Sequence, residues 1–235
     1  MHRFIKYIAK VIYLSVALCA SCLVFAEEQS STSAENDNEA VASQFAPIFT
    51  AITQELSKNQ AKYLMNPFAY ADFINTRVKS HWDMASTTSA LVGKAQFLAL
   101  QPQDQGRLVA AVDLTLMRYA FEGLEHYSAQ IFDVVNVVIN KQGTLGWVQV
   151  RMQSPILMDL NLDLLIKRFA TNGWKAVDVR FKGITYVAIK KHEYRRIIRQ
   201  VGVEGLIETL NQKNTDFFTD VCAKASSQPK GTTPC

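Results

Sequence analysis

The chain has 235 residues, of which 49% are hydrophobic and 20% are charged, with 25 lysines and arginines against 21 acidic residues. This length is enough for one domain with a sizeable core. The small positive charge does not provide the dense cationic face that a nucleic-acid binder needs, so we expect no nucleic-acid partner.

The first 26 residues have the three-part layout of a secretory signal peptide. Arg3, Lys6 and Lys10 precede the uncharged run VIYLSVALCASCLVF, and the segment ends at the small residue Ala26. We expect cleavage after Ala26, and an uncleaved membrane anchor is the rival interpretation. Removal of the leader takes away three cations and no acidic residue, which leaves an exported chain with a net charge near +1.

Both ends of the remaining chain are polar. Residues 27–39, EEQSSTSAENDNE, predict a disordered spacer, and residues 226–235, SSQPKGTTPC, predict a flexible tail. Residues 40–225 between them form one predicted domain. Only Cys222 and Cys235 remain after cleavage, and the sequence leaves open whether they form a disulfide or two free thiols.

The first half of the domain is predicted to be helical. Apolar residues recur every three or four positions in AVASQFAPIFTAITQELSKNQ, which is typical of an amphipathic helix. Asn66 and Pro67 have the pattern of an N-cap followed by a first-turn proline. Asp83 is expected to cap a third helix, and a further helix is expected from Pro102 to Tyr127.

After Tyr127 the hydrophobic period changes to two. QIFDVVNVVIN and TLGWVQVRMQS flank a turn at KQG, and two more strands are predicted in PILMDLNLDLLIKRF and Trp174–Phe181. Two helices follow, ITYVAIKKHEYRRIIRQVG and VEGLIETLNQKNTDFFTDVCAKA. This order predicts an α+β fold, with an antiparallel or mixed four-stranded sheet and helices packed on one face.

Residues suited to catalysis are not grouped in this sequence, which has no nucleophile elbow, phosphate loop, zinc motif or dinucleotide fingerprint. His81-Trp82-Asp83 is better explained as a helix cap beside a packed aromatic than as half a metal site. Asp159 and Asp163 are about 13 Å apart along a strand, too far to act as a pair, and we interpret them as solubilising residues. We therefore expect no enzyme activity, no metal and no cofactor.

Two segments carry a family resemblance. WKAVDVRFKGITYVAIKKHEYRRIIRQVGVEGLIETL, residues 174–210, resembles the C-terminal signature of the MlaC (toluene-tolerance, ABC-transport auxiliary) family of periplasmic phospholipid-binding proteins. The upstream block at residues 81–132 resembles a second family segment. The matching positions in the signature are Trp174, Lys175, Val177, Asp178, Val179, Gly183, Ile184, Tyr194, Gly202, Glu204, Gly205, Leu206, Ile207 and Leu210.

The sequence departs from the family pattern at four positions. Thr185 replaces the usual serine, Ile197 and Ile198 stand where phenylalanine is usual, and Phe97 stands near the family tryptophan. These departures affect the expected lipid selectivity rather than the expected fold.

The resemblance implies a periplasmic carrier with an apolar cavity between the sheet and the helices. Such a carrier, expected to be a monomer, would shuttle phospholipid between an inner-membrane ABC-transporter complex and an outer-membrane lipoprotein complex. Phospholipid is then the cargo, and no cofactor is implied. Two alternatives stay open: a carrier of another hydrophobic cargo such as a hopanoid, and a non-lipid periplasmic adaptor module with a solid core.

The apolar strand faces are predicted to line the lipid cavity, and residues of neighbouring helices are predicted to close it. The expected lining residues are Val148, Val150, Met152, Leu160, Leu162, Leu164, Val177, Val179 and Phe181. The expected closing residues are Ile184, Val187, Leu116, Phe121 and Leu124. A basic cluster, Lys190, Lys191, Arg195, Arg196 and Arg199, is either a solvated helix face or a surface for lipid head groups or an acidic partner.

Overall fold

The computed structural model describes residues 36–155, 158–171 and 173–224. The chain divides into two units, Met1–Ala40 and Val41–Cys235, and the fold below is that of the second unit. The expected leader and C-terminal tail lie outside the described residues. Of the expected spacer, residues 36–39 are described and are helical, so helical structure begins before the boundary expected at residue 40.

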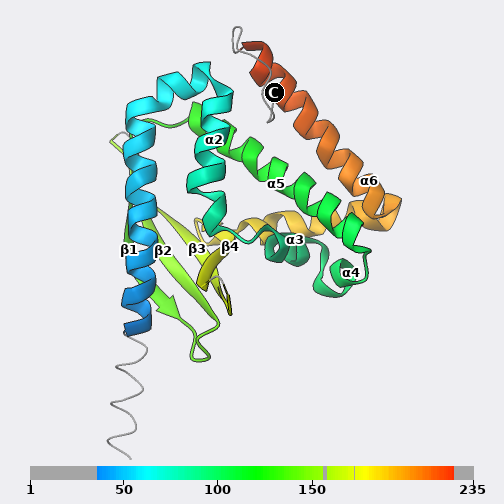
Figure 1. The fold of residues 1–235 in the computed structure, drawn as a ribbon, viewed down its shortest axis with the longest axis horizontal. Coiled ribbons are helices and arrows are strands. Elements are labelled where there is room, and N and C mark those ends of the chain that lie inside the picture. The colour runs from blue at the N-terminus through cyan, green and yellow to red at the C-terminus, as the bar shows by residue number, and fades with distance from the viewer. Residues whose placement is uncertain (1–35, 156–157, 172, 225–235) are drawn as a thin grey trace, which may run out of the picture. The chain divides into compact units, whose positions relative to one another are not determined.

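The first part of the fold is helical, as predicted. Helix covers residues 41–65, here called the N-terminal helix. The following elements are α2 (Pro67–Arg77), the 3₁₀ helix η1 (Lys79–His81), α3 (Met84–Val92), α4 (Lys94–Leu98) and α5 (Pro102–Glu125) (Figure 1). Both predicted caps are confirmed, because the Asn66 side chain accepts a hydrogen bond from the Ala69 N–H and Asp83 accepts one from the Ser86 N–H.

The strands form one antiparallel sheet in the order β1-β2-β3-β4-β5. Their bounds are β1 Ile131–Ile139, β2 Leu145–Gln153, β3 Leu160–Phe169, β4 Gly173–Phe181 and β5 Ile184–Thr185. The prediction of four strands is therefore corrected to five, with no parallel neighbours in the sheet. The fifth strand was missed because two residues, paired only with Phe181 and Arg180, are too few to show a period of two.

The last helix, α6 (Tyr186–Lys224), contains one sharp break. Gly202 adopts φ 75° and ψ −179°, a backbone region open almost only to glycine, and it separates two helical stretches. The two C-terminal helices predicted from the sequence are therefore present on either side of this kink.

The start of α6 explains part of the sequence signature. Asp178 Oδ1 accepts hydrogen bonds from the Val179 N–H at 2.8 Å and the Val187 N–H at 3.2 Å, and Thr185 Oγ1 accepts one from the Ala188 N–H. The bonds to Val187 and Ala188 satisfy amide groups that the first turn of α6 leaves free. Gly183 provides the left-handed conformation, φ 81°, that the β4–β5 turn requires.

Three apolar clusters hold the elements together. The N-terminal helix packs on one face of the sheet, with Val41, Phe45 and Phe49 against residues such as Val148 and Ile166 (Figure 1). A second cluster joins α3, α4, α5 and α6, and a third joins the N-terminal helix, α2, α5 and the end of α6. In the described part of the chain, no helix has both the length and the apolar sequence needed to cross a membrane.

Candidate functional site

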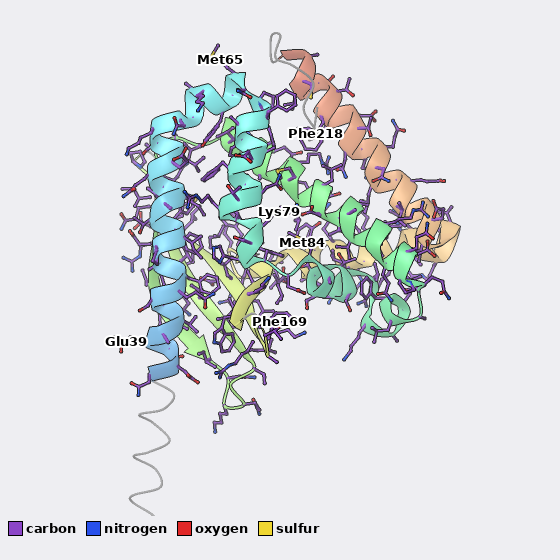
Figure 2. All side chains as sticks on the ribbon, viewed as in Figure 1. Glu39, Met65, Lys79, Met84, Phe169 and Phe218 are labelled. Atoms are coloured by element: carbon purple, nitrogen blue, oxygen red, sulfur yellow. The ribbon has the colours of Figure 1, made fainter. Side chains whose placement is uncertain are left out.

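An apolar cavity of about 430 Å³ lies where the third cluster meets the sheet. Its size falls within the range of small-molecule sites, about 300–1,000 Å³. Figure 2 labels two of its lining residues, Lys79 just after the end of α2 and Met84 at the start of α3. The full lining is Ile74, Val78, Lys79, Trp82, Met84, Asp113, Leu116, Met117, Tyr119, Ala120, Leu162, Val179 and Tyr186.

A second cavity of about 200 Å³ adjoins the first on the side of the N-terminal helix. It is lined by Phe45, Ile48, Phe49, Ile52, Val78, His81, Trp82, Leu162, Leu164, Ala176 and Val179. Val78, Trp82, Leu162 and Val179 line both cavities, so these four side chains form their common wall. The two cavities are therefore neighbours on the same face of the sheet, and their linings are mostly apolar.

The common wall depends on the position of Trp82. The Asp83 N–H donates to the Ala176 carbonyl at 2.8 Å, and Trp82 forms an isolated bridge with the same residue of β4. The indole Nε1 donates to Thr87 Oγ1 at 2.9 Å, and the Thr87 hydroxyl donates to the Val177 carbonyl. The interpretation of His81-Trp82-Asp83 as a cap beside a packed aromatic is confirmed, and the aromatic is packed against the cavities.

Polar groups are few around the larger cavity. Lys79 and Asp113 form an ion pair in its wall, with Nζ and Oδ2 2.6 Å apart. The Tyr186 hydroxyl lies 3.2 Å from that of Tyr194, and burial raises the pKa of Tyr186, so the phenol is neutral. Burial, together with the nearby Lys175 charge, lowers the pKa of His81 beside the smaller cavity, which favours the neutral imidazole.

The structure brings four of the predicted lining and closing residues to the cavities: Leu116, Leu162, Leu164 and Val179. They come together because Leu164 lies opposite Val179 in the sheet and Leu162, two residues earlier on β3, lies on the same face. Leu116 faces them from α5. The role of these residues in binding lipid stays a prediction.

Other predicted residues lie in the solid core or at the edge of the sheet. Val148 and Val150 are fully buried beneath the N-terminal helix, and Phe121 and Leu124 belong to the third cluster, where Phe121 packs edge-on against Tyr70. Four further residues lie at the end of the sheet: Met152 and Leu160, which face each other and are half-buried, and the exposed Phe181 and Ile184. None of these eight residues lines either cavity.

Val177 does not share a face with Val179, contrary to the predicted alternation. Leu165 pairs with Asp178 and Ile166 pairs with Ala176, so a bulge leaves Val177 without a partner residue in β3. Val177 instead lines a separate open groove of about 690 Å³, and so does Val187.

Asp163 is likewise not the solvated residue that we expected. It is buried, and its Oδ2 accepts hydrogen bonds from Arg180 Nε and Nη2 at 2.9 and 2.7 Å. The Arg180 guanidinium also lies 4.0 Å from the centre of the Trp147 ring. The ion pair and the stacked indole compensate for the burial of this charge.

The basic cluster is divided among different local roles. Lys190 pairs with Glu193, and Arg195 donates to the Ala90 and Leu91 carbonyls at the end of α3. Lys191 is half-buried, whereas Arg196, which donates to Gln200, and Arg199 are exposed. A role for this cluster towards a head group or a partner stays a prediction.

Two further expectations concern disulfides and metals. Cys222 is disulfide-bonded, and Cys235 lies outside the described residues. Among the described residues, no three histidine, cysteine or acidic side chains are close enough to hold a metal ion.

Sequence reasoning missed the cavity residues that come from helices. Ile74 and Val78 are four residues apart and share one face as α2 runs into η1, and Asp113 precedes Leu116 and Met117 by one turn of α5. This spacing was visible in the sequence, but it is the same for a residue that fills a core. Nothing in the sequence links Lys79 to Asp113, so neither residue could be identified as part of the cavity wall before the fold showed their ion pair.

Comparisons with known proteins agree with this fold. The sequence profile of the MlaC protein family matches residues 48–212. A phospholipid-binding protein from Ralstonia solanacearum, solved in complex with a phospholipid, aligns with a TM-score of 0.56 and 17% sequence identity. The alignment covers 81% of this chain and 97% of that protein. A search of curated proteins gives no match.

Proposed function

Because the chain belongs to the MlaC family, whose profile matches most of its length, we propose that it binds phospholipid, with the acyl tails in the two adjoining cavities. The observation that carries this proposal is the pair of mostly apolar cavities on either side of Trp82 and Leu162. The phospholipid bound to the structurally similar Ralstonia protein supports the same class of ligand.

The division of the space suits a ligand with two chains. The larger cavity would take one tail and the smaller cavity part of the second, with the common wall of Val78, Trp82, Leu162 and Val179 between them. Each methylene removed from water contributes about 0.8 kcal/mol, so about thirty methylenes account for roughly 20 kcal/mol. A carrier must offset a cost of that size before a lipid can leave a membrane.

The finer role follows from the family rather than from the cavity. We propose that the mature protein is periplasmic, as MlaC family proteins are, and that it exchanges lipid with an inner-membrane ABC-transporter complex and an outer-membrane lipoprotein complex. In this role it acts as a monomer and performs no catalysis, because moving a lipid breaks no covalent bond.

The test is direct. The full chain is expressed in a Gram-negative host, purified from the periplasm without detergent, and analysed by native mass spectrometry and by lipid extraction. We expect a protein mass increased by that of one phospholipid. A hopanoid in the extract would favour the alternative cargo, and a protein mass with no lipid would contradict the proposal and favour an adaptor.

Transport is tested separately by labelled lipid in donor and acceptor vesicles that carry the purified membrane complexes. Transfer should depend on this protein and on both complexes. Transfer at the rate of a protein-free control would contradict the shuttle.

A further inference from the structure

An open groove lies on the face of the sheet away from the N-terminal helix. Its β3 residues, Leu165, Lys167 and Phe169, alternate with Leu164 and Ile166, which belong to the cluster beneath that helix. The groove has a volume of about 690 Å³, and none of its lining residues lines either cavity. We call it the α3 groove, because α3 forms one of its walls. It is separate from the space proposed for lipid.

Part of the lining of the α3 groove is apolar and accessible. Leu98 is 62% exposed, and Leu165, Phe169 and Val187 are half-buried. Serine hydroxyls and charged side chains make up much of the remaining lining, in contrast to the mostly apolar linings of the two cavities. An acyl tail is stabilised by enclosure in apolar groups, whereas an open lining of mixed polarity is typical of protein interfaces. The α3 groove therefore suits a polypeptide better than a lipid tail.

The lining includes three cations without a counter-charge. Lys94, Lys167 and Arg195 form no ion pair with an acidic side chain in the described part of the chain. The two acidic residues of the groove, Asp83 and Asp178, already accept hydrogen bonds from backbone N–H groups at the starts of α3 and α6. The charge balance of the groove therefore favours an anionic partner.

Lys167 has a further reason to bind an anion. It lies directly opposite Lys175 on β4, and like charges at such positions repel each other. Its Nζ donates to Ser86 Oγ at 3.4 Å and lies 4.9 Å from the centre of the Phe169 ring, contacts that supply no negative charge. A carboxylate bound beside Lys167 would relieve this repulsion.

The two exposed lysines of the groove lie at opposite ends of α3. Lys167 contacts Ser86 in the first turn, and Lys94 directly follows Gly93, where the helix ends. The rise of the helix from Ser86 to Val92 is about 9 Å. An extended chain covers that distance in about three residues, at ~3.3 Å each. A segment with two acidic residues about three positions apart can therefore reach both lysines.

We propose that the α3 groove is a docking site for an extended segment of a partner protein. An apolar side chain of the segment packs on Leu98, Leu165 and Phe169, and acidic side chains on either side of it bind Lys94 and Lys167. The proposal goes beyond the proposed function and does not depend on it, because the groove and the cavities share no lining residue. A partner can dock here while the cavities are filled.

The experiment is a binding screen on an immobilised library of short peptides composed of glutamate, glutamine, lysine, leucine and glycine. The chain purified from the periplasm carries a fluorescent label, and the selected peptides are then titrated in solution by fluorescence anisotropy. We expect them to contain two glutamates about three positions apart with leucine between them. Replacing both glutamates by glutamine should weaken binding by about tenfold, because both charge-assisted contacts are lost.

Lys94→Glu/Lys167→Glu reverses both charges at exposed positions and should leave the fold intact. It should weaken binding of the selected peptides by more than about tenfold and select lysine-containing peptides instead. The matched control is Lys58→Glu/Lys141→Glu, which changes the net charge equally at two other exposed positions and should keep the wild-type selection. Native mass spectrometry should show the same lipid content in all three proteins.

Three results would overturn the docking site: selection of no peptide, selection of peptides without acidic residues, or wild-type binding by the Lys94→Glu/Lys167→Glu variant. Oleate, added as a competitor, should not displace a selected peptide. Displacement by oleate would show that the groove is a second lipid site and would also overturn the proposal. Lipid in the two cavities is measured separately by the native mass, so a failure of the docking site and a failure of the proposed function are distinguishable.

Discussion

Leu162 lies at the point where the two cavities meet, and replacing it by aspartate is the most direct test of the proposed binding site. Its side chain lines both cavities and is half-buried, with Val150 and Phe181 opposite it on the neighbouring strands. In the absence of lipid, water in the cavity can hydrate the new carboxylate. We therefore expect Leu162→Asp to fold.

The expected loss of lipid affinity depends on the water that a bound acyl tail would displace from the new carboxylate. A hydrocarbon chain beside residue 162 removes the hydrating water and supplies no donor in return. Burying a polar group without a hydrogen bond costs about 2–7 kcal/mol, and an ionised carboxylate costs more. A loss of at least about 3 kcal/mol corresponds to a weakening of lipid binding by more than roughly a hundredfold.

The assay compares bound phospholipid in wild type and variant by native mass spectrometry after purification from cells, with thermal unfolding as a check on folding. The matched control is Asn161→Asp, which adds the same charge one residue earlier on β3. Asn161 is exposed, points to the opposite face and lies across from Arg151, so lipid retention should not change. A folded Leu162→Asp variant that keeps wild-type amounts of lipid would refute the assignment of these cavities to acyl tails.

Three further predictions concern stability and can be measured by urea unfolding. Gly202→Ala should destabilise the protein by about 1–3 kcal/mol because φ 75° is strained for alanine. Gly106→Ala, in α5 with open space around it, should instead stabilise the protein by about 0.5–1 kcal/mol. Equal effects of the two substitutions would contradict the kink at Gly202. Arg195→Gln should lower the unfolding free energy by about 1 kcal/mol because it removes two hydrogen bonds to carbonyls at the end of α3. Arg199→Gln, at an exposed position, should have almost no effect. A larger loss of stability in Arg199→Gln than in Arg195→Gln would rule out the capping role of Arg195. Burial raises the pKa of Asp178, so the folded protein holds that proton more tightly than the unfolded chain, in which aspartate titrates near pH ~3.9. The unfolding free energy of wild type should therefore fall relative to Asp178→Asn as the pH rises from about 4 through the raised pKa and then level off, and a rise in that window would contradict this reasoning.

The local features of the fold could be predicted from the sequence because neighbouring residues produce them. A side-chain cap needs only Asn66 or Asp83 and the amides of the next turn, and both caps are present. The change of period after Tyr127 likewise identified the strands β1 to β4. The signature around Asp178 and Gly183 predicted the family, and in the structure these residues shape the β4–β5 turn and the start of α6.

The departures at the candidate site depend on contacts between distant segments. The bulge that moves Val177 into a separate groove is a mismatch between β3 and β4. The pairing of Lys79 with Asp113 joins residues 34 positions apart, and neither residue is unusual in its own segment. Hydrophobic periodicity shows which face of an element is apolar, but not which element will cover it.

Val150 and Leu162 show where the information in the sequence ends. Both are aliphatic residues on the same face of the sheet, and they lie directly opposite each other on β2 and β3. The alternation of apolar and polar residues is enough to predict that both side chains turn away from water. Their different surroundings follow from the packing of the helices: the core beneath the N-terminal helix buries Val150 completely, whereas Leu162 borders two cavities. The physical reason is that a cavity forms where the helices covering the sheet leave a space unfilled. The same alternation of residues occurs in a closely packed core and in a cavity wall, so it does not reveal which of the two will form.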